Sequence, residues 1–236
     1  GLADGPLAGV AFSAADQALY TCQSSESGSA FVYRVSPVDG SVVWSTELST
    51  STGNETVSGV FALDGGGVIV AGSTGGSFGA SIPSHGEGSC FLSRLDASGS
   101  VLWVRQYDLD ECGAAAVSTS TLYATGSVDG DVFVGSFSAV DGSVEWNSTV
   151  GSTGLVSGGV DIGVSVCADS MGNVYCVGRT NGIDFAGSSS SGKYVNTDRM
   201  FIVSLNSSGS LRWSELIGSY EHSAIGGAVV VDEHDS

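Results

Sequence analysis

One phrase that ends in tryptophan occurs four times in this sequence and limits the fold more than any other feature. In each copy a Gly-Ser pair is followed by Val or Leu, by one variable residue and by Trp; the copies end at Trp44, Trp103, Trp146 and Trp213. Such self-similarity is typical of repeat proteins, in which each repeat is one supersecondary unit. We therefore expect the four Trp to occupy equivalent, mostly buried positions.

A second phrase, which begins with Phe, precedes each tryptophan phrase. Its copies begin at Phe31, Phe91, Phe133 and Phe201. Each Phe lies four residues before an apolar residue that closes the run, so both lie on one face of a strand. The Gly-containing segment between the two phrases predicts a hairpin turn. In each repeat, two further short apolar runs come before the Phe phrase, so the repeat contains four short strands.

The last strand of each repeat indicates how the units pack. We expect Val42 and Trp44 to share one face, because alternate residues of a strand point the same way. A single four-stranded sheet cannot bury such a face alone, so neighbouring sheets must stack. The sequence therefore predicts an all-β fold, a β-propeller-like array of about four four-stranded antiparallel blades plus the first strand of a fifth.

The predicted blades cover about residues 7–49, 57–108, 112–150 and 160–217, with an extra strand at 224–232. They form a single β-propeller-type repeat domain or a fragment of one. The loops 72–89 and 178–199 are long, whereas the corresponding loops of the first and third repeats are short, which indicates a super-repeat of two blades. The extra strand has no following strand to pair with, so we expect an unpaired apolar edge and association there.

Two stretches of the chain carry a resemblance to known repeats. The segment 122–146 resembles the repeat of pyrroloquinoline-quinone (PQQ-type) propellers, and the segments 174–185 and 198–213 resemble the bacterial SBBP propeller repeat. The resemblance covers nearly the whole chain and implies the fold. Its residues match only the blade-packing motif, so it implies no catalytic residue.

The charge of the chain excludes two classes of partner. Seven Lys and Arg stand against 25 Asp and Glu, a formal net charge of −18. A chain this acidic lacks the positive surface that nucleic acids require and would be repelled by an anionic membrane surface. We therefore expect neither nucleic-acid binding nor membrane insertion.

Cysteines and glycosylation sequences favour an oxidising, extracellular compartment. The sequence Asn-x-Ser/Thr occurs at Asn54, Asn147 and Asn206, and we expect all three to be exposed acceptors of N-linked glycans. A hairpin centred between residues 171 and 172 would place Cys167 opposite Cys176 and permit a disulfide. Cys90 and Cys112 are candidates for a second bridge. Cys22 then remains, either as a buried thiol or for an intermolecular bridge.

Metal and catalytic motifs are weak. The cysteines lack zinc-site spacing, and His85, His222 and His234 fall in loops and near the end of the sequence. Acidic groups at 108–111, 129–131 and 232–235 offer oxygen ligands for calcium but lack the spacing of a calcium loop, so solvated turns are the simpler interpretation. We expect no cofactor, leave calcium open, and find no nucleophile elbow or phosphate-binding loop.

Two functions remain compatible with the sequence. The first is a secreted, N-glycosylated structural or assembly protein, a candidate subunit of an extracellular filament or surface structure, which associates with itself or with other extracellular proteins. On this interpretation we expect no enzymatic activity. The second is a propeller that binds a sugar, peptide or calcium through its long loops, or a fragment of a PQQ-dehydrogenase-like propeller.

Overall fold

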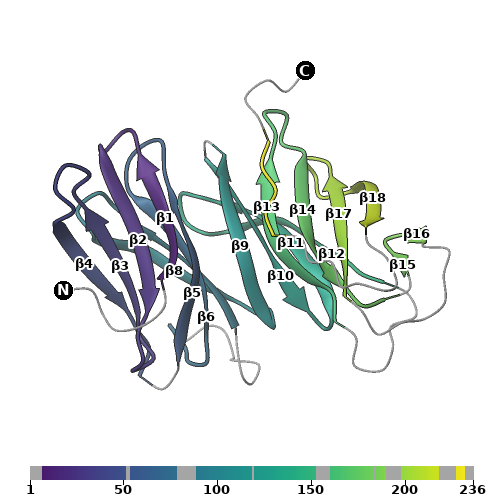
Figure 1. Ribbon diagram of the computed structural model, residues 1–236, viewed down its shortest axis with the longest axis horizontal. Coiled ribbons are helices and arrows are strands. Elements are labelled where there is room, and N and C mark those ends of the chain that lie inside the picture. Colours follow the sequence, from purple (N-terminus) through teal and green to yellow (C-terminus); the bar gives the residue numbers. More distant parts are fainter. Residues whose placement is uncertain are drawn as a thin grey trace. The chain divides into compact units, whose positions relative to one another are not determined.

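In the residues that the structure describes, the chain forms four antiparallel sheets of four strands each and one two-stranded pair, as expected for an all-β array of propeller blades (Figure 1). This computed structural model describes residues 7–51, 54–78, 89–118, 120–152, 160–182, 184–189, 198–217 and 227–231. No helix occurs in those ranges. In each sheet the strands follow chain order, and we call them A to D.

The sheets alternate in the length of the connection between strands B and C. Sheet 1 contains β1 (Leu7–Ser13), β2 (Ala18–Ser24), β3 (Ala30–Val35) and β4 (Val42–Leu48). Sheet 2 contains β5 (Glu55–Ala62), β6 (Val68–Thr74), β7 (Ser89–Leu95) and β8 (Val101–Tyr107). Sheet 3 contains β9 (Glu111–Ser118), β10 (Thr121–Val128), β11 (Asp131–Ser138) and β12 (Val144–Val150). Sheet 4 contains β13 (Ile162–Ala168), β14 (Val174–Thr180), β17 (Arg199–Leu205) and β18 (Leu211–Ile217), and its long B–C connection holds the small pair β15 (Asp184–Phe185) and β16 (Ser188–Ser189).

The chain divides into two compact units. The first comprises residues 1–112 together with Ala139–Gly142, the tip of the turn between β11 and β12. The second comprises residues 113–138 and 143–236. Each unit has its own buried core. In the first, β5 packs against sheet 1 around Tyr20 and Val60, and in the second, β13 packs against sheet 3 around Tyr123 and Val166.

The segment predicted as the first strand of a fifth blade is not a strand in its described part, residues 227–231. Its Val229 backbone N–H donates a hydrogen bond to Ser165 Oγ, 3.2 Å, on β13. Ser165 pairs with Val177, and Gly9 of sheet 1 pairs with Cys22. Val177 and Cys22 hold the same position on strand B of their sheets, so Ser165 corresponds to Gly9. The segment therefore lies beside strand A of sheet 4.

All four D strands contain the same β-bulge, which corrects one sequence-based expectation. Trp44 pairs with Arg34, but Val42 pairs with Val35, so one extra residue is inserted between the two pairs. Arg34 and Val35 are adjacent and point to opposite faces, and Val42 and Trp44 therefore do too. The prediction that they share a face was wrong. The other three sheets have the same shift, at Arg94/Leu95, Ser136/Phe137 and Ser204/Leu205.

The turns between strands C and D also alternate in length. Their closing backbone hydrogen bonds span Ser36–Ser41 in sheet 1 and residues 138–143 in sheet 3, but only Asp96–Ser100 in sheet 2 and Asn206–Ser210 in sheet 4. Odd sheets thus have a turn one residue longer than even sheets. This alternation coincides with that of the B–C connections, so the repeating unit is a pair of sheets.

Each C–D turn has a glycine in the left-handed region, and three of these four glycines lie under a tryptophan. A Cβ atom on Gly209, whose φ is +81°, would lie 2.6 Å from Trp146. A Cβ atom on Gly40, whose φ is +72°, would meet nothing within 4 Å. The two glycines have the same backbone conformation but differ in what covers them.

Replacing these glycines separates backbone strain from packing. We expect Gly40→Ala to lower the free energy of unfolding by about 1 to 2 kcal/mol, the cost of a left-handed Ala. Gly209→Ala should cost about 1 to 3 kcal/mol more, because its methyl group collides with Trp146. Urea unfolding of both variants measures the difference, and equal losses would contradict the role assigned to the Trp contact.

Candidate functional site

A tryptophan from one sheet packs on the C–D turn of the next, and this contact is the most regular feature of the structure. Trp44 lies on Gly99, Trp103 on Gly142 and Trp146 on Gly209. The Trp103 contact lies within the first unit, to which the turn tip Ala139–Gly142 belongs. The glycines leave room for the indole ring because they have no side chain.

Hydrogen bonds to the carbonyl groups of the turn reinforce each contact. In sheet 1, Trp44 Nε1 donates to Ala97 O at 3.0 Å, and Thr46 Oγ1 donates to Gly99 O at 2.7 Å. In sheet 2, Tyr107 OH donates to Gly142 O at 2.6 Å.

In the first two sheets an arginine also donates a charge-assisted hydrogen bond to a carbonyl group of the next turn, and in the third sheet a serine donates to such a group. Arg34 Nη1 donates to Ala97 O at 3.2 Å, and Arg94 Nη1 to Ala139 O at 2.9 Å. In sheet 3, Ser148 Oγ donates to Gly209 O at 2.6 Å. The turns thus present backbone acceptors to donors on the preceding sheet.

A tyrosine on strand B positions the tryptophan in three sheets. The ring centroids of Tyr20 and Trp44 lie 5.8 Å apart at an interplanar angle of 50°, and those of Tyr123 and Trp146 lie 6.3 Å apart at 48°. Tyr175 and Trp213 have nearly the same geometry, 6.1 Å and 51°. Such tilted pairs stabilise one ring orientation.

Trp213 differs from its three equivalents in its exposure. The Trp103 side chain is 8% exposed, and Trp44 and Trp146 are partly buried, whereas Trp213 is 41% exposed. The expectation of equivalent burial was therefore wrong for Trp213, because no described turn covers it. We call the face that carries the Trp in each sheet its forward face; in sheet 4 it contains Trp213, Glu215 and Ile217.

Two buried acids occupy equivalent places in the two even sheets. Glu55 begins strand A of sheet 2, and Asp161 directly precedes strand A of sheet 4. Both side chains are almost fully buried. The backbone N–H of Glu55 donates to Gly28 O and that of Asp161 to Gly130 O, each at 2.8 Å. Thr74 Oγ1 donates to Glu55 Oε1 at 2.8 Å. Burial raises the pKa of Asp161, against hydrogen bonds from Thr180 and Ser152 that lower it. Sequence reasoning missed these two acids, and only their place in the repeat could have indicated them.

A third acid joins sheets 1 and 2. Asp16 Oδ2 accepts hydrogen bonds from Tyr20 OH at 2.7 Å and from the Gly67 N–H of sheet 2 at 2.8 Å. Burial acts to raise the pKa of Asp16, but hydrogen bonds from Tyr20, Gly67 and Ser13 outweigh it and the pKa lies below its ordinary value of 3.8.

The cysteines pair differently from the first expectation. Cys90 is disulfide-bonded to Cys112, with a Cα–Cα distance of 4.9 Å. Cys167 and Cys176 are not bridged, which contradicts the predicted pair. The hairpin is centred one half-residue earlier than assumed, so Cys176 pairs with Val166, and Cys167 with Tyr175. Cys22 is a buried thiol whose pKa burial raises to about 12, so it is out of reach of an intermolecular bridge.

The three predicted glycan acceptors lie at the surface to different degrees. Asn54 and Asn147 are exposed, and Asn206 is half-buried. Asn206 Oδ1 accepts hydrogen bonds from Ser208 N, Ser208 Oγ and Ser210 N, which close the turn of sheet 4. These bonds all use the side-chain oxygen of Asn206.

The calcium candidates are only partly described. Within the described ranges no three acidic, histidine or cysteine side chains gather into a group that could hold a metal ion. His85, His222, His234 and the acids at 232–235 lie outside those ranges. The described part of the chain also contains no helix long and apolar enough to cross a membrane.

Comparison with known proteins supports the propeller fold. Among solved structures, the chain is similar to the quinohemoprotein alcohol dehydrogenase ADHIIG from Pseudomonas putida HK5, with 16% identity and a TM-score of 0.57 over 90% of this chain and 36% of that one. It is also similar to a europium-containing methanol dehydrogenase, with 14% identity and a TM-score of 0.55 over 84% of this chain and 39% of that one. BamB from Moraxella catarrhalis matches with 14% identity and a TM-score of 0.50 over 90% of this chain and 65% of that one.

These likenesses confirm the resemblance to PQQ-type propellers at the level of the fold. The chain spans about a third of the length of the alcohol dehydrogenases that it matches. No family model and no curated protein matches the sequence. Because the matched structures include both enzymes and BamB, the fold alone leaves the function open.

The Asp16 bridge leads to a prediction about acid stability. Asp16→Asn should lower the free energy of unfolding at pH 7 by about 1 to 2 kcal/mol, allowing for partial exposure. Because the pKa of Asp16 is lowered on folding, its stabilisation should disappear as the pH falls below 3.8. Asp39→Asn, which affects hydrogen bonds only within its own turn, is the control and should cost less. A pH-independent loss for Asp16→Asn would contradict this assignment.

The disulfide should contribute measurable stability. Cys90 and Cys112 are 22 residues apart, and closing a loop of this size is worth about 3 kcal/mol. We expect a Cys90→Ser, Cys112→Ser double variant in oxidising buffer to unfold like the parent protein in reducing buffer. If reductant left the unfolding curve of the parent unchanged, the bridge would have no such role.

Proposed function

We propose that this protein is a secreted, N-glycosylated structural protein that acts by associating with other protein, as a subunit of an extracellular filament or surface structure. The observation that carries the proposal is the exposed forward face of sheet 4. Trp213 is held by Tyr175 in the orientation that packs on a turn in sheets 1 and 3, yet it remains 41% exposed. A large aromatic side chain, prearranged and uncovered, favours a protein interface.

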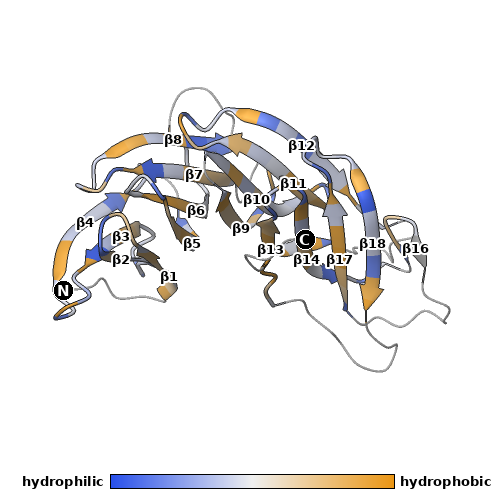
Figure 2. Cartoon of the chain, turned by 90° about the horizontal axis from the view of Figure 1, so that it is seen from above, coloured by the Kyte–Doolittle hydropathy of each residue, from blue (hydrophilic) through white to orange (hydrophobic). Residues whose placement is uncertain are grey.

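Apolar residues on outer strands add to this support. Figure 2 shows hydrophobic segments on β4, β8 and β18. Val43 and Leu102 are both more than half exposed at equivalent positions of their bulges. The acidic surface keeps such a chain soluble and allows association only where apolar faces match.

The secreted location rests on two features. A disulfide such as Cys90–Cys112 persists in oxidising compartments. Asn54 and Asn147 are exposed in acceptor sequences, as attachment of a bulky glycan requires.

A second candidate function has one observation in its favour. A hollow of about 350 Å³ lies beside the C–D turn of sheet 1, within the size range of small-molecule sites. It is lined by Gln17, Ala18, Arg34, Val35, Ser36, Pro37, Val38 and Val43. A ligand-binding propeller would use such a hollow. Chemical-shift changes at Arg34 on addition of neutral sugars would favour this candidate over the structural one.

The structural proposal is tested on protein from a secreting eukaryotic host. We expect sedimentation to show association that increases with protein concentration, and glycopeptide mass spectrometry to show hexose at Asn54 and Asn147. A single monomeric species across the concentration range, with bare Asn at every acceptor, would contradict the proposal.

A further inference from the structure

Part of the rear face of sheet 1 is uncovered at Leu7 and Val10, as part of the forward face of sheet 4 is uncovered at Trp213. In register, Leu7 and Val10 of β1 correspond to Val57 and Val60 of β5. Val57 and Val60 are 8% and 5% exposed, because they pack on the forward face of sheet 1. Leu7 and Val10 are 62% and 70% exposed.

The rest of the rear face of sheet 1 agrees with this contrast. Phe31 and Val35 are partly exposed, whereas their register equivalents Phe91 and Leu95 are fully buried. The C–D turn of sheet 1 is also uncovered, since nothing lies within 4 Å of a Cβ atom on Gly40. Strand A, strand C and the C–D turn of sheet 1 are thus more exposed than their equivalents in sheet 2, although Gln23 and Tyr33 on the same face are buried.

The alternation of the turns matches these two open faces to each other. Trp213 belongs to an even sheet, like Trp103, and Trp103 packs on the longer turn of an odd sheet, at Gly142. The open turn Ser36–Ser41 is of that longer type and has the same Val-Asp-Gly-Ser sequence as residues 140–143. The open Trp and the open turn thus belong to the type of pairing that Trp103 and Gly142 already form.

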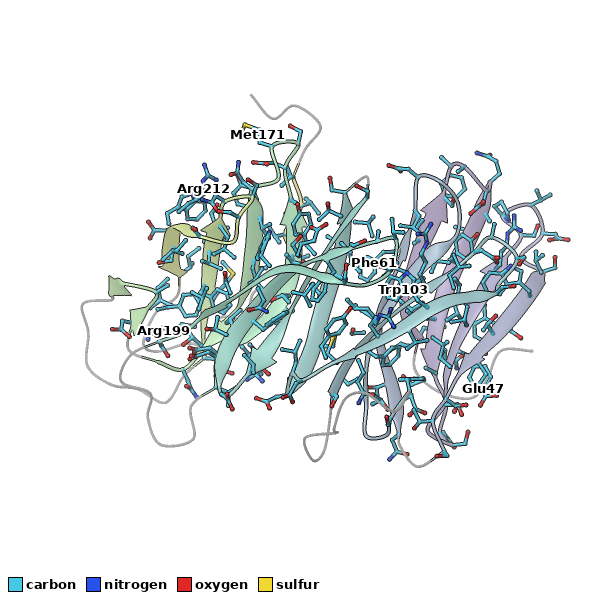
Figure 3. The ribbon with its side chains drawn as sticks, turned by 180° about the vertical axis from the view of Figure 1, so that it is seen from behind. Glu47, Phe61, Trp103, Met171, Arg199 and Arg212 are labelled. Carbon is cyan, nitrogen blue, oxygen red and sulfur yellow. A yellow bond between two sulfur atoms is a disulfide. The ribbon has the colours of Figure 1, made fainter. Side chains whose placement is uncertain are left out.

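Sheet 4 also has a guanidinium group that could donate to a following turn, as Arg34 and Arg94 do in sheets 1 and 2. In sheets 1 and 2 an Arg on strand C donates to the next turn; in sheet 4 that register position is Ser204. Arg212 Nη1 donates to Ser204 Oγ at 3.0 Å, so Arg212 of the adjacent strand carries the charge to that position. Figure 3 shows Arg212 near the end of sheet 4 that carries Met171.

We propose that the forward face of sheet 4 binds the rear face of sheet 1 of a second copy of this chain, with Trp213 on the Ser36–Ser41 turn. The proposal rests on the proposed function and names its partner. Such a contact joins two different surfaces and is heterologous, so it can repeat from copy to copy. The same packing that joins sheets within the chain then continues between chains.

The segment 227–231 competes for this contact. The Val229 N–H binds Ser165 Oγ, and the position equivalent to Ser165 in sheet 1, Gly9, lies next to the backbone of Val60 on the following strand A. Val229 thus occupies the place that Val10 of the second copy would take. On this proposal the segment covers only the strand A side of the forward face, while Trp213 on strand D stays open, so removing the segment should strengthen association.

One position of the new contact is less favourable than its equivalents. Thr46, Arg105 and Ser148 each donate to a carbonyl of the following turn. Glu215 occupies this position in sheet 4, and an ionised carboxylate can only accept. Association should therefore be weaker than the packing inside the chain, and a donor at position 215 should strengthen it.

The test uses four variants of the full chain and one control, with association measured by sedimentation. Trp213→Ala and Val10→Asp should each weaken association at least about tenfold, as for a residue central to an interface. Glu215→Thr should strengthen it, and so should deletion of residues 227–236. Met171→Asp, at an exposed residue of the turn between β13 and β14 and outside both faces, should change nothing. Circular dichroism checks that each variant is folded.

Mixing the two damaged proteins gives the sharpest result. Trp213→Ala retains an intact sheet 1, and Val10→Asp retains an intact sheet 4. Together they should form heterodimers that do not grow, although neither associates alone. If both variants associate like the parent chain, this contact is wrong while the structural function stands. If the chain is monomeric even without residues 227–236, both proposals fail.

Discussion

The contact between an indole ring and a glycine turn holds this protein together. A four-stranded sheet has two faces and can bury neither alone, so every sheet depends on its neighbours. Trp44, Trp103 and Trp146 each cover a left-handed glycine that admits the ring, and neighbouring side chains donate hydrogen bonds to the carbonyl groups of the same turn. Apolar burial and backbone hydrogen bonding are thus satisfied at one place.

Much of the fold could be predicted because its signals are local and repeated. The four Trp phrases, the Phe phrases and the glycine turns each mark one hairpin, and their recurrence marks the sheets. The bulge before each Trp could not be predicted, because Val42-Val43-Trp44 is compatible with simple alternation. The cysteine register failed for a related reason. A shift of one residue in a hairpin moves Cys176 from Cys167 to Val166, and composition does not determine turn length to that accuracy.

The candidate site was harder to foresee than the fold. Trp213 has the same sequence context as the other three, and only its neighbourhood in space distinguishes it. The same holds for Val10, which resembles the buried Val60. Glu55 and Asp161 were hidden among 25 acidic residues, since nothing in their immediate sequence predicts burial. Exposure is a property of the neighbours, which a reading of single motifs does not include.

The alternation of turn length has an evolutionary consequence. Repeat proteins grow and shrink when segments of a gene are duplicated or lost. Here the two kinds of junction differ: Trp44 and Trp146 lie on the shorter turn, whereas Trp103 lies on the longer one. Copying a single sheet would place a ring on the wrong kind of turn. Duplication of a pair preserves both junctions, so the lineage of this chain should change its length by two sheets at a time.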